Sequence, residues 1–472
     1  MLLNGVASGR CLTRLMTLVV LCLLASPAGS AQGRKRPIAF ADLPPSLHEW
    51  IAAQGVKAEN FSARLDSINR ETVERVRDGE FDHLIHYILQ SKLFTRQPRI
   101  EPAVSAYEFV QNLDVAERAK YLAEDSTYLP PAKKIPDSVR ARIKEFAGSS
   151  ASGYDDPRWT YFQSLLSGTA GDRVEKLLSE YARAMRFLYR KEFASRQVRP
   201  EEVAAYVSAL YQTRGHSTDT QVEANFAVFT ALSSLPRPTI SGRIDKVLIV
   251  GPGHDLAPRV GLIDDLPPQS FQPFAVADAL LQLGFSDRRH LRIHGVDINQ
   301  RVVDYLQKVS QRPVDLVLVS GLADNESHRF TDEFREYFRS LGQAIGVETE
   351  ARLPRDLAGH LRKVLTVNDT RGLISGDNLN IVTERYEIPR QFDLVVVTNV
   401  FPYFNRLELL LALTNISSML KPGGYLIHNE LQNIPALFMD LLGLPLEQAR
   451  TILIASSKTA PLYDGVAIHR KK

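Results

Sequence analysis

The sequence has very little cysteine. Its 472 residues include only Cys11 and Cys22, and both lie in an apolar N-terminal segment. If that segment is removed as a leader peptide, the rest of the chain can form neither a disulfide nor a thiolate metal site. An excess of charge of one sign is also missing, since 57 Lys and Arg face 54 Asp and Glu. Composition therefore gives no reason to expect a nucleic acid as partner.

Several catalytic motifs are missing as well. The chain has no His-Glu-x-x-His, no Gly-x-Ser-x-Gly and no Walker loop, so metalloprotease, serine hydrolase and P-loop functions have no support. His83 and His86 lie three residues apart on a predicted helix, but no acidic third ligand is marked, and such histidines are more often solvated. We therefore predict no metal site.

The N-terminal segment resembles a signal peptide. Arg10 and Arg14 precede an apolar run at 15–25 and small residues at 26–31, which predicts cleavage near Ala31 and export to the periplasm or the medium. Basic residues at 34–36 disfavour translocation, so the alternative is an uncleaved anchor with the domains in the cytoplasm. That anchor would be the only expected membrane contact, and its run is shorter than the roughly 20 residues of a spanning helix.

Residues 32–240 are predicted to form an all-α domain. Turn signals, such as the proline-rich stretch 129–136, separate the expected helices. These helices are 61–77, 82–91, 103–110, 114–122, 138–146, 172–189, 200–211 and 221–235. Thr220 with Glu223 predicts a capping box that opens the last helix. A sharper alternative is that His216 and Asp219 face a ligand cleft in the following domain.

Residues 241–472 show the pattern of an α/β domain. The apolar run 247–250 breaks into Gly-Pro-Gly, where glycines let the backbone approach a ligand closely. A second strand ends at Asp297, which suits either ribose hydroxyls or the cap of a helix at 300–307. A buried strand at 392–399, a helix at 407–420, a Pro-Gly-Gly turn and a strand at 425–429 predict a βαβ crossover. The runs 451–455 and 465–469 predict an antiparallel hairpin at the sheet edge.

In this order, the motifs resemble the class I S-adenosylmethionine-dependent methyltransferases over residues 241–472. The segment 398–425 is similar to chemotaxis-receptor carboxyl methyltransferases and their relatives. The resemblance implies a Rossmann-like methyltransferase sheet with a terminal antiparallel hairpin, preceded by the all-α domain. It also implies S-adenosyl-L-methionine as the small-molecule cofactor and methyl transfer to an acceptor that the sequence does not identify.

The same resemblance implies a role for each matching residue. Two glycines pass beneath the methionine part of the cofactor, an acid binds the ribose hydroxyls, and the next residue packs on adenine. A Gly-Asp-Asn segment places its acid near the adenine amino group, and two residues after the 392 strand line the cleft where donor meets acceptor. In this sequence, these residues are Gly251, Gly253, Asp297, Ile298, Asp377, Asn378, Asn399 and Val400. The alternative for residues 376–378 is a plain turn.

The chain departs from the family pattern after Gly-x-Gly. His254 follows in place of a third small residue, and prolines at 267, 268 and 273 predict a long loop before a helix at 274–284. Leu256 stands where a dinucleotide dehydrogenase has glycine, and Asp297 lies far beyond the usual spacing, so a nicotinamide enzyme is the weaker interpretation. An insertion at 309–370, with a strand at 313–320 and a charged helix at 331–341, either shapes an acceptor pocket or covers the surface.

No catalytic base is predicted. A sulfonium methyl is already activated, so alignment of donor and acceptor supplies most of the acceleration. Tyr403, Asn399 and His254 are plausible neighbours of the acceptor. The rival hypothesis is an exported, non-catalytic binding or scaffold module that keeps the fold, with the loop 254–272 closing the cleft. Because the cofactor is made in the cytoplasm, an exported enzyme has no obvious supply of it.

Overall fold

The computed structural model describes residues 33–150, 154–168, 171–199, 201–236, 242–257, 262–349, 357, 359–431, 434–457 and 461–472. The predicted signal peptide at 1–31 lies outside these residues. Among the helices of the described ranges, none combines the length and the apolar character needed to cross a membrane.

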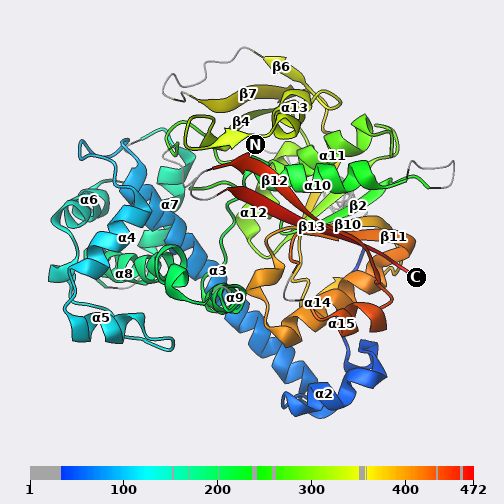
Figure 1. The fold of residues 1–472 in the computed structure, drawn as a ribbon, viewed down its shortest axis with the longest axis horizontal. Coiled ribbons are helices and arrows are strands. Elements are labelled where there is room, and N and C mark those ends of the chain that lie inside the picture. The colour runs from blue at the N-terminus through cyan, green and yellow to red at the C-terminus, as the bar shows by residue number, and fades with distance from the viewer. Residues whose placement is uncertain are drawn as a thin grey trace, which may run out of the picture.

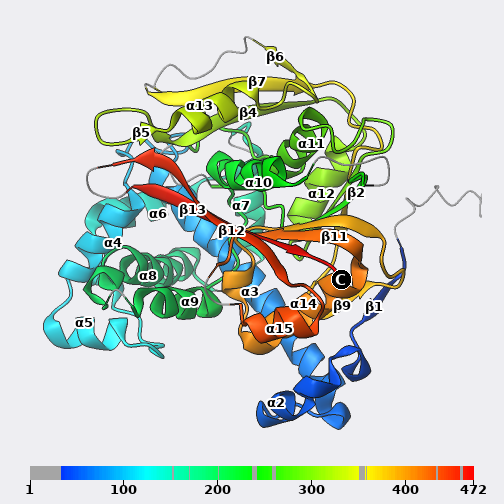
Figure 2. The ribbon, with the colours of Figure 1, turned by 45° about the vertical axis from the view of Figure 1, so that its right-hand side comes forward.

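An eight-stranded sheet forms the centre of the molecule (Figures 1 and 2), in the order β5-β12-β13-β11-β10-β2-β3-β8. The strands are β2 (Lys246–Val250), β3 (Arg292–Asp297), β5 (Arg329–Phe330), β8 (Ile374–Asn378), β10 (Phe392–Val397), β11 (Leu420–His428), β12 (Leu446–Ser456) and β13 (Leu462–Arg470). Strands β8, β3, β2, β10 and β11 are parallel, whereas β13 runs antiparallel to both β11 and β12.

The strand order confirms the predicted fold class. The chain runs from β2 through β3 to β8 and then returns to β10 on the other side of β2, which is the winding of a Rossmann-like sheet. The terminal hairpin β12–β13 is present, and only the two-residue β5 lies outside it. In doubly wound sheets, ligands bind at the carboxyl ends of the strands where the winding reverses, here between β2 and β10.

Two small sheets surround the central one. The predicted insertion contains β4 (Val314–Ala323), β6 (Val347–Thr349) and β7 (His360–Val367), which form an antiparallel sheet at the top of Figure 1. Its charged helix is α13 (Asp332–Ser340), so both elements expected in the insertion are confirmed. Near the N-terminus, β1 (Lys35–Pro37) pairs with β9 (Glu384–Tyr386).

Helices make up most of the chain before β2, as predicted. They are α2 (His48–Ala53), α3 (Phe61–Gln90), α4 (Pro102–Gln111), α5 (Val115–Leu122), α6 (Asp137–Gly148), α7 (Pro157–Ser167), α8 (Arg173–Glu192), α9 (Val203–Thr213) and α10 (Val222–Ser234). After β2 follow α11 (Gln272–Gln282), α12 (Gln300–Val309), α14 (Arg406–Met419) and α15 (Ala436–Leu441). The long loop before α11 is confirmed.

The predicted helices 61–77 and 82–91 are one helix, α3, so the break expected between them is wrong. Residue 79 must be glycine because a Cβ there would collide with the carbonyl group of His216, and Gly215, next to His216, packs against the same turn of the helix. The glycine therefore permits a close tertiary contact and does not end the helix.

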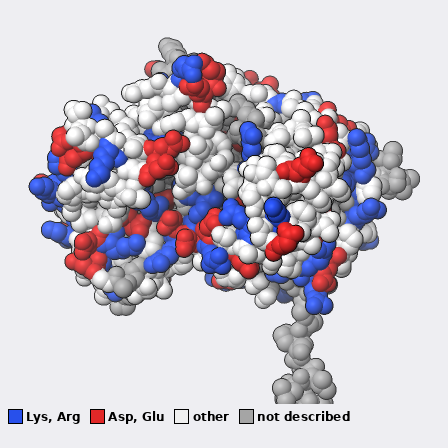
Figure 3. Space-filling model, turned by 90° about the horizontal axis from the view of Figure 1, so that it is seen from below, with Lys and Arg blue, Asp and Glu red and all other residues white. Residues whose placement is uncertain are grey.

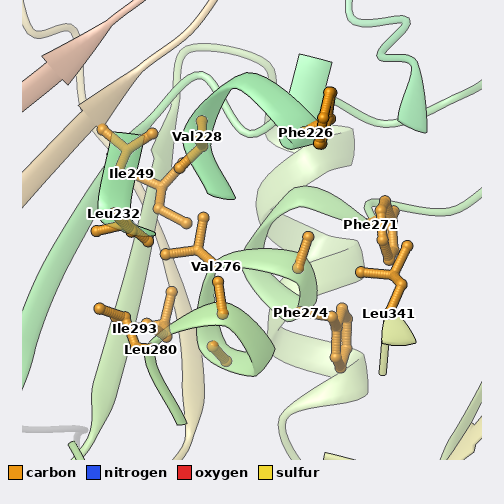
Figure 4. Packing of buried hydrophobic residues seen from close by; sticks show 14 of the residues in the cluster. Phe226, Val228, Leu232, Ile249, Phe271, Phe274, Val276, Leu280, Ile293 and Leu341 are labelled. Carbon is orange, nitrogen blue, oxygen red and sulfur yellow. The ribbon is translucent and has the colours of Figure 1, made fainter. Parts of the chain in front are cut away.

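Three large hydrophobic cores stabilise the fold. The first lies between one face of the sheet and helices α10, α11, α12 and α13, and Figure 4 shows side chains of α10 and α11 meeting those of β2 and β3. The second lies on the other face, under α14, α15 and residues 38–68. The third joins α4, α6, α7 and α8 to the C-terminal half of α3. Helix α10 thus packs on the sheet, although it lies in the segment that was assigned to the helical domain. The domain boundary at 240 stays a prediction.

Candidate functional site

A cavity of about 90 Å³ lies at the carboxyl ends of β2, β3 and β10. Its walls come from α3, from the segment 216–220, from the ends of the three strands and from residues 379–382. Six of the eight residues expected to bind the cofactor line it, namely Gly251, Gly253, Asp297, Ile298, Asn399 and Val400. The structure therefore brings most of the predicted set together at the point where the winding of the sheet reverses.

Both glycines of the Gly-Pro-Gly turn are in the left-handed region, with φ of +65° at Gly251 and +71° at Gly253. A Cβ at Gly251 would collide with the Val400 side chain, and one at Gly253 would collide with Thr218 and Thr220. The turn requires glycine because of both its backbone conformation and these contacts. The close neighbour of Gly253 is the chain's own segment 218–220.

Asp297 is buried at the end of β3. Its carboxylate accepts a hydrogen bond from the Asn299 backbone N–H at 2.8 Å. Burial raises the pKa of Asp297 to about 6, although that hydrogen bond and the nearby Arg301 act against the rise. The alternative role of Asp297 as a helix cap is wrong, because Asn299 caps α12 and accepts from the Arg301 backbone N–H at 3.0 Å.

Asp377 and Asn378 lie in β8, so the alternative of a plain turn there is wrong. Asp377 accepts hydrogen bonds from Lys35 Nζ and from the Tyr386 hydroxyl, each at 3.1 Å. Asn378 Nδ2 donates to the carbonyl oxygen of Ile298 at 3.2 Å. Neither residue lines the cavity, although Asn378 contacts the lining residue Ile298.

Asn399 follows β10 in a left-handed conformation, with φ of +58°. Its backbone N–H donates to Asn429 Oδ1, and Asn429 Nδ2 donates to Asn399 Oδ1, both at 2.8 Å. This reciprocal pair holds a conformation that non-glycine residues seldom adopt outside functional sites.

His216 and Asp219 both line the cavity, as the alternative for the helical half expected. The His216 backbone N–H donates to the Arg75 carbonyl oxygen at 2.8 Å, which ties the segment to α3. Burial, assisted by the charge of Arg75, lowers the pKa of His216 well below its usual value, so its ring is neutral.

The predicted capping box of α10 is wrong. Thr220 donates through its backbone N–H (2.6 Å) and its hydroxyl (3.1 Å) to Asp255 Oδ1, while Gln221 is the N-cap residue. Glu223 accepts from the Gly321 backbone N–H at 2.6 Å. Thr220 and Glu223 therefore join the start of α10 to the α/β half. A capping pattern in the sequence does not reveal such distant partners.

A buried polar network joins α3 to the sheet. Glu80 on α3 pairs with Arg301 at 2.9 Å, and His83 Nε2 lies 3.5 Å from Asp219 Oδ2. His83 and His86 are both buried, so the expectation that they are solvated is wrong. His254, expected near the acceptor, instead contacts Arg301 and donates its backbone N–H to Thr218 O at 2.7 Å. No cluster of three metal-ligating side chains occurs among the described residues.

Arg75 is a cavity residue that the sequence did not mark. Its guanidinium donates to the carbonyl oxygens of Tyr403 (3.1 Å), Arg214 (3.0 Å) and Tyr211 (3.0 Å). It thereby clamps α3, α9 and the turn after β10 together. Sequence reasoning missed it because its partners are backbone carbonyls far away in the chain.

A larger cavity of about 520 Å³ adjoins the first. The two share Ser217, Asp219, Thr220, Asn399 and Tyr403 as lining residues. The larger cavity is also lined by α9, α10, β13 and three residues of the insertion, at positions 317, 319 and 321. The insertion thus shapes a pocket, and Tyr403 and Asn399 stand at its junction with the first cavity.

No family model matches the sequence. No curated protein matches it either. Among solved structures, the chain is similar to the N-methyltransferase NodS of Bradyrhizobium japonicum with S-adenosyl-L-homocysteine, at 13% identity and a TM-score of 0.26, over 53% of this chain and 86% of that one. It is also similar to a TehB-like S-adenosylmethionine-dependent methyltransferase of Corynebacterium glutamicum, at 14% identity and a TM-score of 0.25, over 60% of this chain and 98% of that one.

Magnesium protoporphyrin IX methyltransferase of Synechocystis, with S-adenosylmethionine bound, gives 11% identity and a TM-score of 0.25, over 60% of this chain and 94% of that one. Similarity at this level carries no information on cofactor or acceptor. The fold class stands on the strand order of the sheet.

Proposed function

We propose that the chain binds S-adenosyl-L-methionine in the smaller cavity and transfers its methyl group to an acceptor in the larger one. The observation that carries the proposal is the gathering of six expected binding residues at the reversal of the winding, next to a second cavity that shares five lining residues. When bound, the cofactor would supply a methyl group already activated by its sulfonium charge.

The chemistry of the walls suits a nucleoside. Asp297 offers a carboxylate to ribose hydroxyls, and Ile298 offers apolar surface to a flat base. Asn378 supports this wall from behind through its hydrogen bond to Ile298. The volume of about 90 Å³ is below the roughly 300–1,000 Å³ of small-molecule sites. Binding therefore requires the segment 216–220 to move away from Gly253.

The role of the chain in the reaction is to bind and align the reactants. Asn399 and Tyr403 lie where the cavities meet, and the Asn399–Asn429 pair fixes that corner. The helical half covers the cleft through α3 and the segment 216–220. Such alignment supplies most of the acceleration when the methyl group is already activated.

Isothermal titration of residues 32–472 with S-adenosyl-L-methionine and, separately, with S-adenosyl-L-homocysteine tests the proposal. Saturable binding in the wild type that is lost in Asp297→Ala supports it. Asp304→Ala is the matched control, because Asp304 is an exposed acid on α12, the helix that follows Asp297. Absence of binding by a folded wild-type protein would refute the proposal.

The second candidate is the non-catalytic module. The observation that favours it is the contact of Thr218 and Thr220 with Gly253, which fills the place where a cofactor would pass. The segment 216–220, more than the loop 254–272, closes the cleft. A module of this kind binds neither cofactor form, so the same titration separates the two functions.

A further inference from the structure

The larger cavity is unusually acidic. Five carboxyl groups line it, namely Asp219, Glu223, Asp255, Glu430 and Asp464. Among the described residues, two cationic side chains, Lys191 and Arg214, line it as well. Arg214 is 3.3 Å from Asp82, outside the cavity, and Lys191 is 3.4 Å from Glu192. On the outer face in Figure 3, by contrast, acidic and basic side chains are interspersed.

One carboxylate oxygen in this cavity lacks a partner. Glu223 is only 3% exposed, and its Oε1 accepts from the Gly321 backbone N–H at 2.6 Å. Its Oε2 is buried with no hydrogen-bond partner among the described residues. Burial raises the pKa of Glu223, so its ionised form is costly unless a donor satisfies this oxygen. A cationic N–H donor from a ligand would do so.

Aromatic rings complete the lining. Phe271, Tyr211, Tyr403 and Tyr463 contribute to the walls, and ring faces attract organic cations. The carboxyl groups are spread along a wall that these rings share, and this distribution suits an extended organic cation.

We infer that the larger cavity is the acceptor site and that it binds an organic amine in its ammonium form. This inference rests on the proposed function for its link to methyl transfer, but the binding itself depends only on the cavity. Carboxyl groups and ring faces recognise the ammonium group, whose positive charge favours the ionised form of the carboxyl groups that it contacts, and the shared wall at Asn399 and Tyr403 directs its nitrogen toward the smaller cavity.

The cavity also offers a place for the proton that an ammonium group must lose before its nitrogen becomes nucleophilic. Asp464 lies at its wall and interacts with Asn429, which pairs with Asn399 at the junction. Burial raises the pKa of Asp464 to about 7, so this carboxyl group can take and release a proton near neutral pH.

Titration calorimetry with three ligands of similar size tests the inference: tyramine, its neutral alcohol analogue 4-(2-hydroxyethyl)phenol, and the anion 4-hydroxyphenylacetate. A second amine, 1,5-diaminopentane, covers aliphatic cations. We expect residues 32–472 to bind at least one amine about tenfold or more tightly than the neutral and anionic analogues. Glu223→Gln and Asp464→Asn should each weaken that binding about tenfold, and Glu326→Gln, an exposed acid in the insertion, should not.

Binding of S-adenosyl-L-homocysteine is measured in parallel to separate the two claims. A protein that binds this compound but neither amine overturns the amine inference and leaves the proposed function standing. Amine binding without cofactor binding supports the cation site and refutes the methyltransferase function. Competition between the amine and S-adenosyl-L-homocysteine overturns the acceptor assignment, because the cavity would then hold the amino group of the cofactor itself. Circular dichroism of each variant shows that a lost signal does not come from unfolding.

Discussion

Burial controls the charge of the carboxyl groups around the two cavities. The pKa of Asp297 is raised to about 6, that of Asp464 to about 7 and that of Asp255 to about 8, in each case mainly by burial. Each of these groups therefore changes charge in a pH range where the protein is easily studied.

The raised pKa of Asp297 predicts that the affinity for S-adenosyl-L-homocysteine depends on pH. The carboxylate accepts hydrogen bonds from ribose hydroxyls best when it is ionised, so protonation below about pH 6 should weaken binding. We expect the affinity for S-adenosyl-L-homocysteine to fall up to about tenfold from pH 7 to pH 5. Asp297→Asn should bind more weakly at pH 7 and show no such fall. An equal fall in both proteins would contradict this role.

The raised pKa of Asp255 predicts that the protein loses stability as pH rises toward about 8. Its pKa is raised above the unfolded value, first by burial and then by the charge of Asp219, so the stabilising protonated form is lost as pH rises through about 8. Asp255→Asn keeps an Oδ1 acceptor for Thr220 and cannot ionise. Between pH 7 and pH 9, the free energy of unfolding of the wild type should fall by about 1 kcal/mol relative to that of Asp255→Asn. Parallel curves in urea titrations would disprove it.

At the scale of elements, the contact between α3 and the segment 214–217 decides how the helical half meets the sheet. Gly79→Ala inserts a methyl group where the His216 carbonyl lies, and overpacking of this kind costs about 1–3 kcal/mol. Gly148→Ala, in helix α6 with open space around the new Cβ, is the matched control and should be neutral or slightly stabilising. Thermal unfolding of both variants measures the difference, and equal melting temperatures would contradict the packing argument.

The segment 216–220 is the element that must move when a ligand reaches Gly253. Its backbone is held by hydrogen bonds to Arg75, Asp255 and His254, at 2.6–2.8 Å. We expect saturating S-adenosyl-L-homocysteine to speed hydrogen exchange at the backbone amides of His216 and Thr220 and to slow exchange at the amides of residues 297–299. Exchange that slows in both segments would show that the cofactor enters without displacing this segment.

Six of the eight strands of the central sheet could be predicted from the sequence because apolar runs and glycine turns mark them locally, whereas β5 and β8 were not expected as strands. The family resemblance carried by these motifs also identified six residues of one cavity. The helical cover could not be predicted in the same way. A break between residues 77 and 82 was expected because the contact of Gly79 with His216 joins residues far apart in the chain and leaves no local signal. Thr220 was interpreted as part of a capping box because its real partner, Asp255, is also remote in the sequence.

At the scale of the whole molecule, α3 links the two halves. Its 30 residues span about 45 Å, and Figure 1 shows it running from the helical group to the region of α2. Its first turns, with Phe61, Leu65 and Ile68, belong to the core under the sheet, and its last turns belong to the helical core. Between them, Arg75 and Glu80 bind the segments around the smaller cavity.

This arrangement predicts that the chain unfolds as one unit. Calorimetry of residues 32–472 should show a single transition, because melting either core would break the helix that supplies the other and would leave the Arg301 guanidinium buried without Glu80. Glu80→Ala removes the ion pair and should lower the melting temperature and broaden or split the transition, whereas Glu59→Ala, an exposed acid just before α3, should leave it unchanged. Two separate transitions in the wild type would mean that the helical half folds independently and that its cover over the cleft can open without disturbing the sheet.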